Sequence, residues 1–235
     1  MTIDARASQN AESKQRVAEA AARMVEDGMI VGLGSGSTAE LFVRALGARV
    51  ADGLRVRAVA TSSRTETIAR SMGIEVVELD CPLDLVVDGA DAVERGTLAA
   101  IKGLGGALTR EKVVAAAARR FVLIVDTTKV VNRFGDAFVR VPAPVEVLPF
   151  GWKMTARRLA EIGSPVVREQ DGAPVMTDNG NLIVDLYHPG ELDPHRLAAA
   201  IDSITGVVEH GLFLDMAVSA IVGSPDDIYQ LHRDR

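Results

Sequence analysis

The chain has 235 residues, of which 48% are hydrophobic and 25% charged, and its net charge is −6 at pH 7. This composition is typical of a globular protein of one large or two modest domains, not of a disordered or fibrous chain. The negative charge, without basic runs and with few aromatic residues, argues against nucleic acid as a partner. The polar start lacks a secretory signal and no apolar run is long enough to cross a membrane, so we expect a cytoplasmic protein.

Helices and strands alternate through the first half of the chain. We predict a helix at 13–27, an apolar strand at 29–33, a glycine loop, and a helix at 39–47. Strands follow at 55–61, 74–79, 83–91 and 121–126, with helices at 64–73 and 110–120. Several strands are apolar throughout, which predicts an α/β fold with a mainly parallel sheet flanked by helices. In such a sheet the ligand binds at the carboxyl ends of the strands.

The pattern changes after about residue 138. Strands are expected at 141–149, 165–169, 182–187 and 206–211, with helices at 152–163 and 193–204 and a turn at 177–181. The order β-α-β-β-α-β predicts a second, smaller α+β domain of the ferredoxin-like type. The segment 215–224 reads as a strand that returns to the first domain. We therefore predict a large domain of residues 1–138 and 212–235, and a small domain of residues 139–211.

The glycine loop after the first strand opens a helix, and free backbone amides at such a position suit a phosphate. A dinucleotide site also needs an acidic residue at the end of the second strand, where this chain has hydroxyl groups and Arg64 instead. Three interpretations stay open: an NADP site that uses Arg64, a tight turn capped by Ser37 or Thr38, and a sugar-phosphate site. The sugar-phosphate site would use Ser35, Gly36, Ser37 and Thr38.

Two aspartates, Asp88 and Asp91, follow a buried strand and are separated by Gly89 and Ala90. Both side chains can therefore face one crevice, although strand-end aspartates also cap helices. In the crevice, carboxylates hold sugar hydroxyls and pass protons between oxygens.

Lys102 opens the glycine-rich run Gly103, Leu104, Gly105, where the backbone can approach a ligand closely. An ammonium group there stabilises the negative charge that develops when a C–H next to a carbonyl is deprotonated. Glu111 falls on the first turn of the next helix. It either complements the helix dipole behind a Thr109 N-cap or acts as the base, which needs neither metal nor cofactor.

Lysines and histidines complete the candidate residues. Lys129 follows the strand at 121–126 and Lys14 lies in the first helix, and either can neutralise a phosphate. The four histidines lie in the last quarter of the chain without ligand spacing, so we predict no metal site. The single cysteine, Cys81, excludes an internal disulfide, and we expect it to be buried.

Taken together, VGLGSGSTA, TSS, DLVVDGAD, IKGLGGALTREK, VDTTK, PVEVLP, TDNGN, GVVEHGLF and VGSP resemble ribose-5-phosphate isomerases of type A over nearly the whole chain. The resemblance implies a Rossmann-like main domain, a dimer or tetramer, and no cofactor. It also implies reversible isomerisation of ribose 5-phosphate and ribulose 5-phosphate in the non-oxidative pentose phosphate pathway.

The resemblance further implies roles for single residues. Glu111 would carry the proton between C1 and C2, beside Asp88, Asp91 and Lys102. The implied substrate contacts are these two aspartates and Lys102, together with Lys14, Ser35, Gly36, Ser37, Thr38, Gly89, Ala90, Gly103, Leu104, Gly105 and Lys129.

The chain departs from the family at three positions. Ser35 stands where threonine is usual, Ala92 where glutamate is usual, and Leu104 where glycine is usual. We expect an aldose–ketose isomerase in which Asp88 or Asp91 assists ring opening, Glu111 transfers the proton through a cis-enediolate, and Lys102 stabilises the charged oxygen. The rivals are an NADP-dependent reductase and a non-catalytic sugar-phosphate sensor that would not need Glu111.

Overall fold

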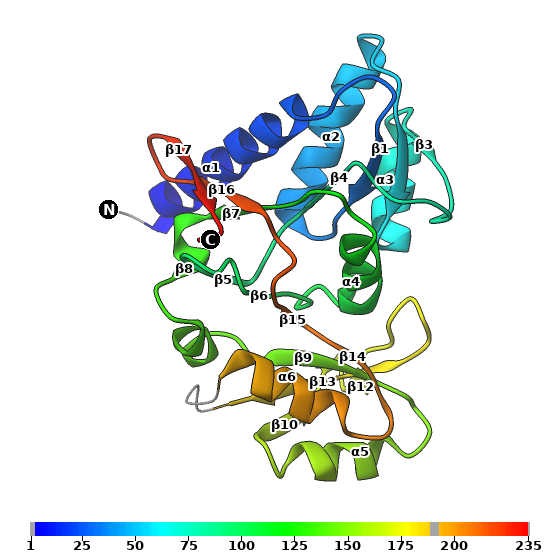
Figure 1. Ribbon diagram of the computed structural model, residues 1–235, viewed down its shortest axis with the longest axis vertical. Coiled ribbons are helices and arrows are strands. Elements are labelled where there is room, and N and C mark those ends of the chain that lie inside the picture. Colours follow the sequence, from blue (N-terminus) through cyan, green and yellow to red (C-terminus); the bar gives the residue numbers. More distant parts are fainter. Residues whose placement is uncertain (1–2, 189–192, 235) are drawn as a thin grey trace.

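The computed structural model describes residues 3–188 and 193–234. Residues 1–2, 189–192 and 235, which the predicted domain ranges include, lie outside the described residues. Figure 1 shows a larger unit built on a twisted sheet and, below it, a smaller unit of strands and helices, with helix α4 between the two.

The main sheet has seven strands in the order β17-β16-β7-β4-β1-β2-β3. All neighbouring pairs are parallel except β17, which runs antiparallel to β16. The predicted mainly parallel sheet is therefore confirmed, and so is the return of the segment 215–224, which supplies β16. The strands are β1 Ile30–Leu33, β2 Arg57–Ala60, β3 Glu75–Val76, β4 Leu85–Asp88, β7 Phe121–Asp126, β16 Ser219–Gly223 and β17 Ile228–His232.

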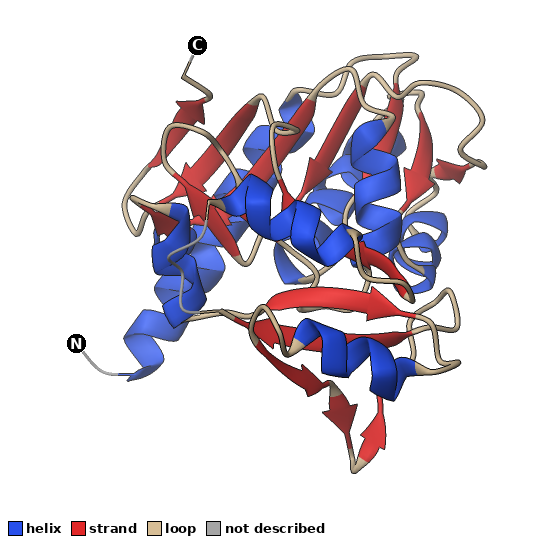
Figure 2. Ribbon diagram, turned by 60° about the horizontal axis from the view of Figure 1, so that its bottom comes forward, coloured by secondary structure: helices blue, strands red, loops and turns tan. Residues whose placement is uncertain are grey.

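Helices cover both faces of this sheet (Figure 2). On β4, Val87 packs into the cluster formed with α1 and α2, whereas Val86 packs into a second cluster with α4. Successive strand residues point to opposite faces, which is why this strand is apolar without alternation. The helices are α1 Ile3–Arg23, α2 Ser37–Ala51, α3 Ser63–Ser71 and α4 Leu108–Ala116, so α1 begins ten residues before the predicted start at 13.

A second small sheet, which we did not predict, has the order β15-β6-β5-β8. Its strands are too short to give a periodic signal: β5 Ala92–Glu94, β6 Ala100–Ile101, β8 Val130–Val131 and β15 Leu212–Phe213. Ile101 pairs with Leu212, and the next amide, that of Lys102, donates to the carbonyl of Gly211 at 2.8 Å. A Cβ at Gly211 would lie 2.1 Å from the Lys102 carbonyl oxygen, so only glycine allows this approach. The sheet thereby fixes the backbone from which Lys102 projects.

The smaller unit has an antiparallel sheet of order β10-β13-β9-β14 with two helices. The elements follow the predicted β-α-β-β-α-β order, with a short hairpin added between β10 and β13. They are β9 Ala143–Val147, α5 Trp152–Leu159, β10 Ser164–Val167, β11 Glu169–Gln170, β12 Ala173–Pro174, β13 Leu182–Tyr187, α6 Pro194–Asp202 and β14 Val207–His210. Two 3-10 helices, η1 Thr127–Lys129 and η2 Phe134–Val139, precede this unit. The domain limits at 139 and 211 stay a prediction.

Two further expectations concern the surface. No helix within 3–188 and 193–234 is both long and apolar enough to span a bilayer. Cys81 is only half-buried, so the expectation of a buried thiol is wrong. A hydrogen bond with Asp80 raises the pKa of this thiol, which disfavours the reactive thiolate.

Candidate active site

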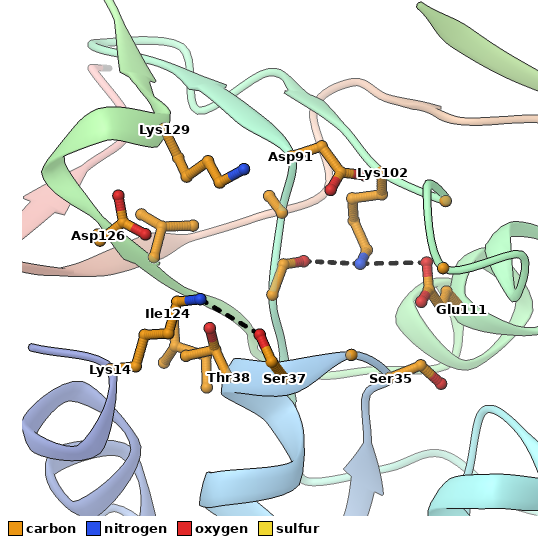
Figure 3. Close-up of a pocket in the computed structure, with 16 residues that line it drawn as sticks. Lys14, Ser35, Ser37, Thr38, Asp91, Lys102, Glu111, Ile124, Asp126 and Lys129 are labelled. Atoms are coloured by element: carbon orange, nitrogen blue, oxygen red, sulfur yellow. Dashed lines mark hydrogen bonds and ion pairs between the residues drawn. The ribbon is translucent and has the colours of Figure 1, made fainter. Parts of the chain in front are cut away.

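The carboxyl ends of β1, β4 and β7 open into a cavity of about 140 Å³ (Figure 3). Almost every residue expected to contact substrate lines it, although these residues come from segments as distant as α1 and α4. The lining residues are Lys14, Ser35, Gly36, Ser37, Thr38, Gly89, Ala90, Asp91, Lys102, Gly103, Gly105, Glu111, Ile124, Val125, Asp126 and Lys129. Two expected residues, Asp88 and Leu104, are not among the lining residues.

Lys102 lies between the carboxylates of Asp88 and Glu111 at the buried end of the cavity. Figure 3 shows its ion pair with Glu111. Its Nζ is 2.9 Å from Asp88 Oδ2 and 3.1 Å from Glu111 Oε2, and it donates to the carbonyl of Gly89 at 2.6 Å. The residue is 2% exposed. Burial acts to lower the pKa of Lys102, but the charges of Asp88 and Glu111 outweigh it and raise the pKa above the ordinary value. The ammonium group therefore stays charged while it faces the cavity.

Glu111 projects from the first turn of α4 and is 3% exposed. Burial raises its pKa to about 8, against the opposing effect of the Lys102 ammonium, and the charge of Asp88 adds to the rise. Glu111 Oε2 lies 3.1 Å from Lys102 Nζ, and no other donor among the described residues reaches this oxygen. A carboxylate with a pKa raised to this range is suited to accept a proton near neutral pH.

Asp88 is held beneath the cavity rather than lining it. Its Oδ1 accepts the backbone amides of Ser35 at 3.0 Å and Gly89 at 2.7 Å, while Oδ2 faces Lys102. Burial raises the pKa of Asp88, and Lys102 and the two amides oppose this effect. A Cβ at Gly34 would come within 2.0 Å of Oδ1, so glycine is required for this approach. Asp88 thus joins the loops after β1 and β4 and holds Lys102.

Asp91 lines the cavity, and the run that begins at Gly103 lies against it. Asp91 Oδ2 accepts the backbone amide of Leu104 at 3.0 Å. Leu104 is 39% exposed and is not among the lining residues, and its expected contact with substrate stays a prediction. The backbone of the run still reaches the cavity at Gly103 and Gly105.

The open end of the cavity is formed by the start of α2 and two lysines. Gly36, with φ of +93°, is the N-cap of α2 and provides no side-chain cap, so the interpretation of Ser37 or Thr38 as a helix cap is wrong. The first amides of a helix have no partner within it and attract anions. Lys14 donates to Ser37 Oγ at 3.3 Å, and Lys129 approaches from the other side (Figure 3).

Hydroxyl groups from the loops after β1 and β2 meet beside the cavity, as the sheet-edge argument predicts. Ser35 Oγ lies 2.8 Å from Thr61 Oγ1 and 2.9 Å from Ser62 Oγ.

Thr109 is not the N-cap of α4, because that position belongs to Ala107. The Thr109 hydroxyl donates instead to the fully buried Glu146 of the smaller unit at 2.5 Å, which ties α4 to that unit.

Three lining residues were missed by the sequence argument: Ile124, Val125 and Asp126, at the end of β7. Asp126 Oδ1 accepts the amide of Thr128 at 2.9 Å and so shapes η1, which carries Lys129. An aspartate at the carboxyl end of a buried parallel strand is the same signal that identified Asp88. That signal could have found Asp126.

Arg64, the residue on which the NADP interpretation depended, lies outside the cavity. It is paired with Glu40, whose Oε1 is 2.5 Å from Arg64 Nε. The carboxylate already neutralises the group that would have to bind a 2′-phosphate.

A group of possible metal ligands, Asp202, Glu209 and His210, lies on the smaller unit. Lys112 Nζ lies 2.6 Å from Glu209 Oε1 and 3.1 Å from His210 Nδ1. Burial, with the neighbouring Lys112, lowers the pKa of His210. The lysine already supplies the positive charge that a metal would bring, so the arrangement is a structural ion pair.

The family model for ribose 5-phosphate isomerase A (phosphoriboisomerase A) matches residues 57–227, which include Asp88, Lys102 and Glu111. The chain belongs to this family. It is 53% identical over 227 residues to ribose-5-phosphate isomerase A from Thermomicrobium roseum, covering 95% of this chain and 94% of that protein. It is 48% identical to the protein of the same name from Gluconobacter oxydans, over 92% of this chain and 94% of that protein.

Solved structures agree with the sequence comparison. Ribose 5-phosphate isomerase A from Methanocaldococcus jannaschii superposes with a TM-score of 0.90 at 40% identity, covering 95% of this chain and all of that one. A D-ribose-5-phosphate isomerase in complex with phospho-erythronic acid gives a TM-score of 0.89 at 35% identity, over 94% of this chain and 98% of that one. The Rossmann-like fold of the main unit follows from these relatives.

A second family model, the DeoR C terminal sensor domain, matches residues 9–79. This segment includes Lys14 and the loop at Ser35–Thr38 but ends before Asp88. Lys102 and Glu111 are outside it as well. The second match is therefore limited to the end of the cavity that carries Lys14 and the start of α2.

Proposed function

We propose that this chain interconverts ribose 5-phosphate and ribulose 5-phosphate, as an aldose–ketose isomerase of the non-oxidative pentose phosphate pathway. The observation that carries the proposal is the buried arrangement of Lys102 between Asp88 and Glu111 at one end of a cavity whose other end has free helix amides and two lysines. Family membership supplies the substrate. The reductase is set aside, because the family match and the pairing of Arg64 with Glu40 leave it without support.

Glu111 is the proton carrier in this mechanism. Once the sugar ring is open, its carboxylate removes the proton from C2 of the aldose and electrons move onto the C1 oxygen, which gives a cis-enediolate. The same carboxyl group returns the proton to C1, and the ketose results. The raised pKa of Glu111 matches a group that must both take and give a proton near neutral pH.

Lys102 stabilises the oxygen that becomes negative. Its ammonium group is fixed by Asp88 and Gly89 before substrate binds, so little reorganisation is needed when charge develops. Removal of water from this end of the cavity strengthens the interaction, because a charge pair in a low-dielectric site attracts more strongly than in water.

Asp91 is the aspartate best placed to touch the sugar. Asp88 uses both of its oxygens on Ser35, Gly89 and Lys102, whereas Asp91 lines the cavity and has one oxygen on Leu104. We assign ring opening and the exchange of protons between O1 and O2 to Asp91. Asp88 is then the residue that positions Lys102.

The phosphate binds at the open end, against Ser37, Thr38, Lys14 and Lys129. Binding energy gained there, remote from the reacting carbons, fixes C1 and C2 against Glu111 and Lys102. The chain would act in the cytoplasm as a homodimer or homotetramer. Light scattering during size-exclusion chromatography gives the oligomeric state.

A coupled assay that follows ribulose 5-phosphate formation from ribose 5-phosphate, without added metal or nucleotide, tests the function. Steady turnover is expected. A chain that binds ribose 5-phosphate in calorimetry but shows no turnover would be the non-catalytic sensor, and the isomerase proposal would be wrong.

A further inference from the structure

Arg168, which lies between β10 and β11 of the smaller unit, reaches across to the run at Gly103 in the main unit. Its Nη1 donates to the carbonyl oxygens of both Gly103 and Leu104, each at 2.9 Å. Asp185 of β13 holds the other edge of the guanidinium, accepting from Nε at 2.9 Å and from Nη2. The Arg168 side chain is 15% exposed, so the guanidinium is fixed between the two units and largely shielded from water.

These two hydrogen bonds determine where the neighbouring amides point. In a trans peptide unit the C=O and the following N–H point in opposite directions. The Gly103 carbonyl faces Arg168, and the Leu104 amide of the same unit faces the opposite way and donates to Asp91 Oδ2 at 3.0 Å. The Leu104 carbonyl also faces Arg168, so the Gly105 amide is turned to the side of the cavity, which Gly105 lines.

The run cannot hold this arrangement by its own sequence. Gly103 has φ of +99° and Gly106 has φ of +86°, and both Leu104 and Gly105 are exposed. One backbone hydrogen bond, from the Gly106 amide to the Gly103 carbonyl at 3.0 Å, spans the turn. Glycine has access to many backbone conformations, so the peptide units Gly103–Leu104 and Leu104–Gly105 need hydrogen bonds from outside the run to keep one orientation.

We propose that Arg168 is a positioning residue of the isomerase site, a role that rests on the function proposed above. It acts through two peptide units, one of which fixes the carboxylate of Asp91 while the other presents the Gly105 amide to an oxygen of the sugar. The guanidinium also polarises both peptides and makes their N–H groups better donors. The smaller unit thereby takes part in the reaction without lining the cavity.

The alternative is that Arg168 only joins the two units. The two roles predict different effects of a substitution. Loss of a purely structural contact lowers the melting temperature. Loss of a positioning residue lowers kcat/KM in a protein that is still folded, and the size of this loss depends on Asp91. A misplacement of about 1 Å at a reacting group costs on the order of 10²-fold in rate. We expect a loss of that size in kcat/KM for Arg168→Met.

The test compares Arg168→Met and Arg168→Lys with Arg158→Met, which removes an exposed arginine of α5 in the same unit and serves as the matched control. Arg158→Met is expected to behave as wild type. Arg168→Lys keeps a cation within reach of the carbonyls and is expected to lose about tenfold, which keeps the test informative if Arg168→Met does not fold. Folded Arg168 variants with kcat/KM within twofold of wild type would overturn the proposal.

A double-mutant cycle with Asp91→Asn decides whether the effect passes through the peptide unit. The proposal expects the double variant to lose clearly less than the product of the two single losses, since both changes disturb the same unit. Multiplicative losses would show that Arg168 acts independently of Asp91 and would overturn it. Wild-type protein without isomerase activity would refute the proposed function, whereas an active wild type with active Arg168 variants would refute this inference alone.

Discussion

Lys102 and Lys129 lie at the two ends of one cavity, and their surroundings differ. Lys102 is 2% exposed and touches two carboxylates, whereas Lys129 is half-buried on η1 at the open end. Around Lys102, burial and neighbouring charges shift the pKa values of Asp88, Lys102 and Glu111. The other end of the cavity has Lys14, Lys129 and the first amides of α2. Under the proposed function, the buried end stabilises the charge that develops during the reaction and the open end holds the fixed charge of the phosphate.

Substitutions at the two ends of the cavity should also have different effects on the free energy of unfolding. A buried ion pair gains Coulomb energy but pays for the desolvation of both charges, so removing one partner leaves an uncompensated charge. Removal of a half-exposed lysine leaves no buried charge uncompensated, so it costs little stability. Substitutions at the two ends should therefore separate catalysis and stability from substrate affinity.

The largest effect is expected for Glu111→Gln. The amide keeps the shape of the side chain but cannot take the proton, so kcat should fall by a factor on the order of 10²–10⁴. Binding of ribose 5-phosphate, measured by calorimetry, should persist, because the open end is untouched. Near-normal turnover would remove Glu111 from the mechanism.

Lys102→Met should lower kcat by on the order of 10²–10³, since the charged oxygen loses its stabilising partner. It should also lower the unfolding free energy by about 3–5 kcal/mol, because Asp88 and Glu111 are left buried without a cation. Urea titration checks the second effect, with Lys129→Met as the control. Equal unfolding free energies of the Lys102 and Lys129 variants would show that the buried ion pairs of Lys102 do not contribute to stability.

The raised pKa of Glu111 predicts a pH dependence of both rate and stability. The base must be ionised, so kcat/KM should rise about tenfold per pH unit below pH 8 and level off above it. Between the ordinary value of 4.5 and about 8 the folded chain binds more protons than the unfolded chain, so stability should fall as pH rises through this window. Urea titrations at several pH values should show a smaller fall for Glu111→Gln. A rate profile that is flat from pH 6 to 9 would show that Glu111 is already ionised.

Lys129→Met is expected to have the smallest effect. It removes one charged contact to the phosphate, which corresponds to about tenfold in KM, while kcat changes little. The unfolding free energy should stay within about 0.5 kcal/mol of wild type. Steady-state kinetics with ribose 5-phosphate measure the change. A fall in kcat with unchanged KM would show that Lys129 acts in catalysis and not in phosphate binding.

Several parts of the site could be predicted because short-range signals survive in the sequence. Asp88 and Asp91 follow an apolar strand, and the amide donors come from a glycine loop between a strand and a helix. The parallel sheet then brings such strand ends to one edge. Asp126 also stands at the end of an apolar strand, so the same signal predicts it as a site residue.

Other features have no local signal. Strands β5, β6, β8 and β15 have only two or three residues each, so no periodicity identifies them. A helix cap is one of the roles that the sequence suggests for Thr109, because no local signal indicates that Glu146, 37 residues later, accepts its hydrogen bond. Arg168 is likewise 64 residues from Leu104.

The sequence alone therefore determined the alternation of strands and helices, the class of fold, and which side chains stand at strand ends, because hydrophobic periodicity and glycine placement are local properties. Only the tertiary structure decided that Asp88 lies beneath Lys102 while Asp91 faces the cavity, and that burial raises the pKa of Glu111. Burial and the distances between charges arise from segments that meet only when the chain folds, and these quantities set the chemistry of the site.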